Sequence, residues 1–69
     1  MKIEWVEDFK IKVIARNNEI VLSANREGLL SLAENLKLLA EEEGRSHFHL
    51  DEYNSLEEGS VELIVEKTE

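Results

Sequence analysis

The sequence predicts an α+β domain of the order β-β-α-β-β, with a four-stranded, mainly antiparallel sheet and one amphipathic helix packed on one face. Two observations predict this class. The apolar side chains recur with a period of two at both ends of the chain, whereas in the middle they take the three- and four-residue spacing of a helix. The length of 69 residues suits one domain, residues 1–69, and is too short for two. The order of the strands within the sheet stays open.

The first two strands are predicted to form a hairpin. Apolar and polar side chains alternate over residues 9–16, and the apolar set is Phe9, Ile11, Val13 and Ala15. Asn17 and Asn18 follow, and asparagine tolerates the positive φ that a tight turn requires. Residues 19–23 form the predicted return strand, in which Ile20 and Leu22 are expected to point into the core.

A helix of about four to five turns is predicted after Asn25, which suits the N-cap position. Its apolar stripe consists of Leu29, Leu32, Ala33, Leu36, Leu39 and Ala40. We expect burial of this stripe to be the principal source of core stability. Gly44 is the expected C′ residue, because glycine enters the left-handed conformation without penalty.

Two more strands are predicted in the last third of the chain. In residues 46–51 the apolar Phe48 and Leu50 alternate with polar side chains. A polar, acidic loop follows over residues 52–59. Alternation returns over residues 60–66, where the expected inward set is Val61, Leu63 and Val65.

The net charge of −8 is concentrated in one part of the chain. Residues 1–40 carry six basic and six acidic side chains, whereas residues 41–69 carry two basic and ten acidic side chains. This distribution argues against binding to nucleic-acid phosphates and against an anionic membrane surface. An acidic surface attracts a basic partner or a cation, although excess glutamate also serves solubility alone. No apolar run of about 20 residues is present, and no signal peptide is visible, so we expect a cytoplasmic protein.

Two surfaces stand out as candidates for partner contact. A single helix leaves one sheet face open, and Ile14, Val21 and Ile64 are expected there among charged side chains, as in a target contact or a homodimer through the open sheet face. An ordinary solvated sheet with scattered aliphatic side chains fits the same residues. Residues 41–43 are three glutamates at the helix C-terminus, where the helix dipole disfavours carboxylates, so they also mark a candidate functional surface.

His47, His49 and Asp51 lie on one side of the third predicted strand, at a spacing that some metal sites use. A catalytic zinc site also needs a cleft and a second shell, for which a chain of this length leaves little room. We therefore expect no cofactor and treat metal binding as the weaker alternative to a structural or interface role. No nucleophile motif and no phosphate-binding glycine loop is present, so we expect no enzyme activity.

Three segments carry a resemblance to a known family. Residues 25–33 read Asn-Arg-Glu-Gly-Leu-Leu-Ser-Leu-Ala, residues 47–51 read His-Phe-His-Leu-Asp, and residues 59–65 read Gly-Ser-Val-Glu-Leu-Ile-Val. Together they resemble the small bacterial immunity-protein family thirty-two of polymorphic toxin systems, over about residues 9–67. Residues 1–8, with an exposed-looking Trp5, lie outside the pattern. The shared motif falls on Gly28, His47, His49, Leu50, Asp51, Ser60, Glu62 and Leu63.

The resemblance implies a non-enzymatic antidote that binds and neutralises a cognate protein toxin in the producing cell. A toxin that cleaves nucleic acid has a basic substrate cleft, and clustered carboxylates can imitate the phosphate backbone there. Tyr53 can supply the aromatic anchor that often dominates interface energetics. The acidic residues expected to contact the toxin are Glu41, Glu42, Glu43, Asp51, Glu52, Glu57 and Glu58.

Overall fold

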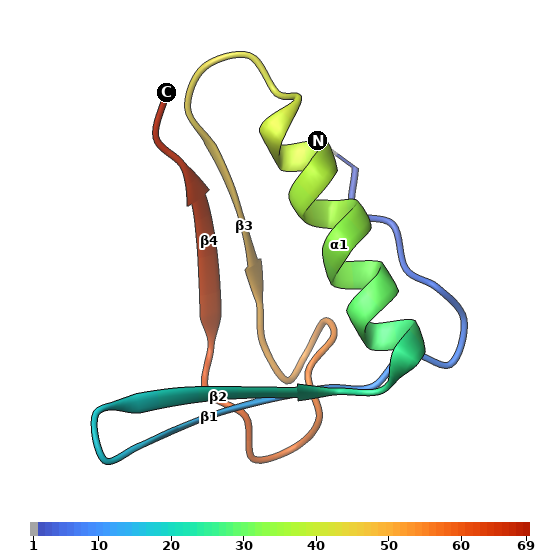
Figure 1. The fold of residues 1–69 in the computed structure, drawn as a ribbon, viewed down its shortest axis with the longest axis vertical. Helices are drawn as coiled ribbons and strands as arrows, with labels where there is room; N and C mark the ends of the chain where they lie inside the picture. The colour runs from blue at the N-terminus through green and yellow to red at the C-terminus, as the bar shows by residue number, and fades with distance from the viewer. Residues whose placement is uncertain (1) are drawn as a thin grey trace.

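The structure, a computed structural model, describes residues 2–69; Met1, the first residue of the N-terminal segment, lies outside the described residues. The helix of the described chain has neither the length nor the apolar composition to cross a lipid bilayer. The predicted α+β class and the β-β-α-β-β order are confirmed (Figure 1). The elements are β1 (Ile11–Arg16), β2 (Glu19–Ala24), α1 (Arg26–Ala40), β3 (Ser46–Leu50) and β4 (Leu63–Lys67).

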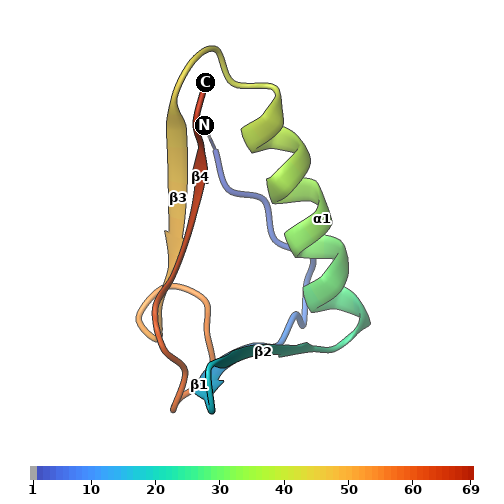
Figure 2. The same cartoon turned by 60° about the vertical axis from the view of Figure 1, so that its left-hand side comes forward.

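The four strands form two separate antiparallel hairpins rather than a single sheet: β1 pairs with β2, and β3 pairs with β4. In Figures 1 and 2 the first hairpin lies crosswise at one end of the second. The second edge of β1 is occupied by the segment before β4. The N–H of Glu57 donates to the carbonyl of Ile11 at 2.9 Å, and the N–H of Val61 donates to the carbonyl of Val13 at 2.8 Å. No strand of the second hairpin can therefore pair with that edge.

The turn of the first hairpin is as predicted, because Asn17 and Asn18 both have positive φ values, 47° and 63°. Ile20 and Leu22 lie on the core face of the hairpin, as predicted, but neither is buried. Leu22 pairs with Val13 and so points to the core face of the hairpin, but it remains 38% exposed, and Ile20 is 65% exposed. The cause is that the hairpin extends past the rest of the molecule toward its turn (Figure 1). Only its inner half covers the core.

The helix begins where the sequence predicts. Asn25 is the N-cap, and its side-chain oxygen accepts the N–H of Gly28 at 2.7 Å and the N–H of Lys10 at 2.9 Å. The predicted C′ position is wrong, because the C-cap is Glu41 and Gly44, with φ of 70°, lies in the connection to β3. The helix therefore ends without a glycine.

Only part of the predicted apolar stripe of α1 is buried. Leu32 and Leu39 belong to the core, whereas Leu29 and Leu36 are about half exposed. The fully buried polar residues Ser31 and Asn35 take their place on the inner side of the helix. The sequence prediction of six buried apolar side chains is wrong, since the N-terminal segment packs against α1 and supplies hydrogen-bond partners to these polar groups.

The core lies between α1, β1, the N-terminal segment and the inner face of the β3–β4 hairpin, whose arrangement Figure 2 shows. Trp5 is half-buried and stacks on Phe9 with ring centroids 4.5 Å apart, so it is less exposed than the sequence suggests. Leu63 and Val65 of β4 pack against the core as predicted, but β4 begins only at Leu63, and Val61 is 42% exposed. The buried hydrophobic residues are Ile11, Val13, Leu32, Leu39, Phe48, Leu50 and Leu56.

Candidate functional site

The acidic residues predicted to form one contact surface lie in two groups at opposite ends of β3 (Figure 1). Residues 41–43 directly follow α1, before β3 begins. Asp51 and the acidic residues after it lie in the connection from β3 to β4. The five residues of β3 alone span about 16 Å at the usual rise of a strand. A small partner surface therefore contacts either residues 41–43 or the acidic residues after β3, but not both groups at once.

The larger group is the connection between β3 and β4, residues 51–62, which we call the acidic loop. It contains five carboxylates and no basic residue. Asp51 and Glu62 stand at its two ends, and Glu52, Glu57 and Glu58 lie between them. Most of these side chains are exposed. The loop is therefore a surface of concentrated negative charge.

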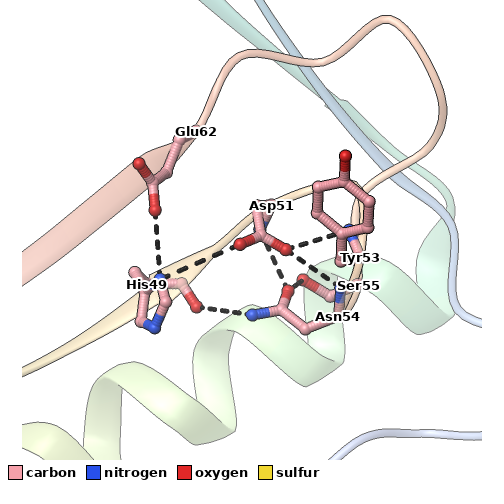
Figure 3. Close-up of polar contacts among 6 residues, drawn as sticks. All are labelled: His49, Asp51, Tyr53, Asn54, Ser55 and Glu62. Carbon is pink, nitrogen blue, oxygen red and sulfur yellow. Dashed lines mark hydrogen bonds and ion pairs between the residues drawn. The ribbon is translucent and has the colours of Figure 1, made fainter.

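Asp51 organises the first half of the acidic loop. One of its carboxylate oxygens, Oδ1, accepts the backbone N–H groups of Tyr53 at 2.9 Å and Asn54 at 3.0 Å (Figure 3). Its backbone carbonyl accepts the N–H groups of Ser55 at 3.0 Å and Leu56 at 2.8 Å. Leu56 is only 5% exposed and joins the core. The loop thus folds over Asp51 and is held to the core by an apolar side chain.

Asn54 is a residue of this site that the sequence reasoning missed. Its Oδ1 accepts the N–H of Asp51 at 3.0 Å and the hydroxyl of Ser55, while its Nδ2 donates to the carbonyl of His49 at 3.0 Å. The signal that could have found it is an aspartate followed three residues later by an asparagine directly after a strand. Both side chains favour local hydrogen bonds to the backbone in such a turn.

The second half of the acidic loop is tied to the first half and to β1. The carboxylate of Glu52 accepts the N–H of Gly59, which has a positive φ of 92°. The hydroxyl of Ser60 accepts the N–H of Val13 at 3.0 Å. Hydrogen bonds therefore fix the loop at both halves, and the acidic surface exists before any partner binds.

Tyr53 lies on this ordered loop with 97% of its surface exposed. Its backbone N–H is held by Asp51, so the position of the residue is fixed although no neighbour covers its ring. A large aromatic side chain in full contact with water gains much from burial against another molecule. Tyr53 is the most exposed large hydrophobic side chain of the loop.

His49 forms a cluster with Asp51 and Glu62, the two end residues of the acidic loop (Figure 3). His49 Nδ1 lies 3.1 Å from Glu62 Oε2 and 4.0 Å from Asp51 Oδ2, and one ligand atom of each residue lies within 4.8 Å of the others. Such a set can bind a divalent cation or hydrogen-bond a partner. His47, which the sequence grouped with His49 and Asp51, is not in this cluster; it pairs with Glu66 in the strand register. The structure thus brings in Glu62 where the sequence placed His47.

The eight motif residues divide into two sets. Gly28, Leu50, Ser60 and Leu63 serve the fold: Leu50 is buried, Leu63 packs on the core, and Ser60 bonds to β1. A Cβ atom at Gly28 would lie 2.5 Å from the carbonyl oxygen of Lys10, so this helix position requires glycine. The other set carries polar side chains at the outer surface of the second hairpin and its loop: His47, His49, Asp51 and Glu62.

Comparison with known proteins yields one family. No curated protein and no solved structure matches the chain. The model of a family described as immunity protein 32 matches residues 19–68. This range contains β2, α1, β3, the whole acidic loop and β4, and it leaves out β1 and the N-terminal segment. Since the match covers well over half of the sequence, the chain belongs to the immunity protein 32 family.

Proposed function

We propose that this protein neutralises a cognate bacterial toxin by binding it through the acidic loop, without catalysing a reaction. Membership in an immunity family supports a toxin as the partner. The observation that carries the choice of surface is the combination of five carboxylates and a 97% exposed tyrosine on a loop that hydrogen bonds hold in place.

The negative charge of the acidic loop indicates which class of toxin it can bind. A surface with five carboxylates and no basic group attracts a positively charged partner and speeds their encounter. Nucleases have positively charged clefts because they bind phosphates. A nuclease toxin acting in the cytoplasm is therefore the partner that this surface fits, and the acidic loop would cover its substrate cleft.

The order of the loop favours tight binding. A segment that is already fixed loses less conformational entropy when it binds than a mobile one does. Tyr53 then supplies the aromatic contact, and the exposed carboxylates of Glu52, Glu57 and Glu58 on the same loop supply the charge. Residues 41–43, at the other end of β3, add long-range attraction rather than contact.

A comparison of two charge reversals tests this proposal. A toxin-like domain encoded next to the gene for this protein is the candidate partner to test, and its binding is followed by surface plasmon resonance at several salt concentrations. The double variant Glu57→Lys/Glu58→Lys changes the acidic loop, and Glu41→Lys/Glu43→Lys makes the same change of charge at the far end. All four side chains are exposed, so both variants should fold.

We expect the loop variant to weaken binding at least about tenfold and to reduce the salt dependence of the association rate. The helix-end variant should slow association much less. Equal effects of the two variants would reject the acidic loop as the contact surface. Unchanged binding in both would reject an electrostatic mechanism altogether.

A further inference from the structure

The outer edge of β2 has no partner in the part of the chain that the structure describes. β1 lies between β2 and the segment before β4, but β2 is bonded on one side only. The backbone N–H of Val13 donates to the Ser60 hydroxyl, and its carbonyl accepts the N–H of Val61, so both groups point away from β2. Val13 and its cross-strand neighbour Leu22 are therefore a non-hydrogen-bonded pair, and the backbone N–H and C=O of Leu22 point away from β1. By the same alternation, Ile20 and Leu22 present their backbone N–H and C=O groups outward.

This edge lacks the features that normally keep strand edges apart. Exposed edges are usually interrupted by lysine, proline or a bulge. Residues 20–24 contain no charged residue and no proline, and their pairing with β1 is continuous. The side chains of Ile20 and Leu22 are themselves 65% and 38% exposed. β4 has two charged residues among its five, Glu66 and Lys67, whereas β2 has one among its six, Glu19 at its first position.

We propose that the edge of β2 pairs, antiparallel, with the same edge of a second copy of this chain. A register centred on Val21 makes the edge complementary to itself. Ile20 of one copy then lies opposite Leu22 of the other, and Glu19 lies opposite Ser23, so no like charges meet. The product is a continuous four-stranded sheet of the order β1-β2-β2-β1.

The distribution of charge favours a second copy over a basic partner at this edge. The hairpin of residues 11–24 contains two basic side chains, Lys12 and Arg16, and one acidic side chain, Glu19. The net charge of −8 belongs to residues 41–69. Two copies can therefore approach through β2 without bringing their acidic segments together, and a basic segment gains nothing from this edge.

The proposed dimer is independent of toxin binding. The acidic loop bonds to the side of β1 that faces away from β2, so it lies at the outer margin of the joined sheet. Both loops remain free, and each dimer presents two of them. The interface also differs from the open sheet face considered from the sequence, since it uses the backbone edge of one strand.

A cysteine placed at the centre of the register tests the pairing directly. The chain has no cysteine of its own, so Val21→Cys introduces one thiol per copy. In the proposed register Val21 faces its own counterpart as a non-hydrogen-bonded pair, about 4.5 Å apart between Cα atoms, which suits a disulfide. Ile64→Cys, on the β3–β4 hairpin, is the matched exposed control.

We expect mild oxidation to convert the Val21→Cys protein to a covalent dimer and to leave the Ile64→Cys protein monomeric on a non-reducing gel. Sedimentation velocity supplies the non-covalent test. The apparent mass of the native protein should rise with concentration from the monomer value of 8.0 kDa toward about twice that value. Ile20→Lys should weaken the dimer at least about tenfold, because a charge now lies on the joined edge, whereas Ile64→Lys should not.

Three outcomes would overturn the proposal: a native chain that stays monomeric over the whole concentration range, cross-linking of Ile64→Cys as readily as of Val21→Cys, or loss of the dimer in Ile64→Lys but not in Ile20→Lys. Circular dichroism shows whether each variant keeps its fold. Toxin binding is not needed for any of these measurements, so failure here leaves the proposed function untouched.

Discussion

The backbone of Glu4 and the side chain of Asn35 exchange two hydrogen bonds. The N–H of Glu4 donates to Asn35 Oδ1 at 2.8 Å, and Asn35 Nδ2 donates to the carbonyl of Glu4 at 2.9 Å. One helical turn earlier, the hydroxyl of Ser31 accepts the N–H of Val6 at 2.8 Å. The backbone of the N-terminal segment is therefore hydrogen-bonded to side chains of α1, in the way that the backbone of a strand is hydrogen-bonded to the backbone of its neighbour.

Asn35→Ala should strongly destabilise the protein. Asn35 is fully buried, and its removal leaves the N–H and the carbonyl of Glu4 without these partners. Each of these two hydrogen bonds contributes about 0.5–1.5 kcal/mol, so we expect a loss of about 1–3 kcal/mol in the free energy of unfolding, measured with urea. Glu34→Ala, at the exposed neighbouring position, should change it by less than about 0.5 kcal/mol. A loss below about 1 kcal/mol in Asn35→Ala would mean that the segment is held by its apolar contacts.

Gly28→Ala should also destabilise, against the helix propensity that favours alanine by about 1 kcal/mol. The added Cβ would lie 2.5 Å from the carbonyl oxygen of Lys10 and 3.0 Å from side-chain atoms of Ala24 and Ile11. This carbonyl accepts the N–H of Asn25, so the strand cannot move without disturbing the N-cap. We expect a net loss of about 1–3 kcal/mol in thermal or urea unfolding.

The comparison for Gly28 is Gly44→Ala, where no atom lies within 4 Å of the new Cβ and the only cost is the left-handed backbone at φ of 70°. Its effect should be about 1 kcal/mol. If Gly28→Ala proved neutral or stabilising, the close packing of α1 on β1 would be refuted.

Local signals in the sequence were enough for the elements of the fold. The hairpin turn depends on two adjacent asparagines and the helix start on the capping side chain of Asn25, and both are set by chemistry within a few residues. The rotation of α1 could not be predicted in this way. Ser31 and Asn35 are buried because a segment about 25–31 residues away bonds to them. No helical periodicity reveals such a partner.

In the candidate site, too, local signals predicted some features, and contacts between distant residues decided the others. The sequence concentrated the negative charge in residues 41–69 but could not show that β3 separates it into two groups. The pairing of β3 with β4 places Glu62 beside His49, thirteen residues away, and leaves His47 outside the cluster. The contact of the acidic loop with β1 likewise occupies an edge of the first hairpin that the sequence pattern leaves open. Contacts between distant residues decide each of these points.

Tyr53→Ala should reduce toxin binding and leave stability unchanged. The side chain touches little of its own protein, since 97% of the residue is exposed, so urea unfolding should shift by less than about 0.5 kcal/mol. Its loss from an interface should weaken binding at least about tenfold, which is 1.4 kcal/mol. Ile64→Ala, another exposed large side chain, should bind like the native protein. Native affinity in Tyr53→Ala would place the contact elsewhere on the molecule.

Two substitutions of Asp51 should separate the structural role of its carboxylate from its charge. Asp51→Asn keeps an oxygen that can accept the N–H groups of Tyr53 and Asn54, so the loop should stay ordered while one negative charge is lost. Asp51→Ala removes both hydrogen bonds. In hydrogen exchange, we expect the amides of residues 53 and 54 to lose protection in the alanine variant by about tenfold or more and to keep it in the asparagine variant.

Hydrogen exchange also tests whether the loop needs a metal. Asp51 Oδ1 already accepts two backbone N–H groups, and His49 Nδ1 already contacts Glu62, so these hydrogen bonds can hold the loop without an ion. We therefore expect exchange protection of residues 53 and 54 to be the same in EDTA and in zinc. If zinc raised this protection in the native protein but not in Asp51→Asn or His49→Ala, the cluster of His49, Asp51 and Glu62 would be a metal site, and the order of the acidic surface would depend on the ion.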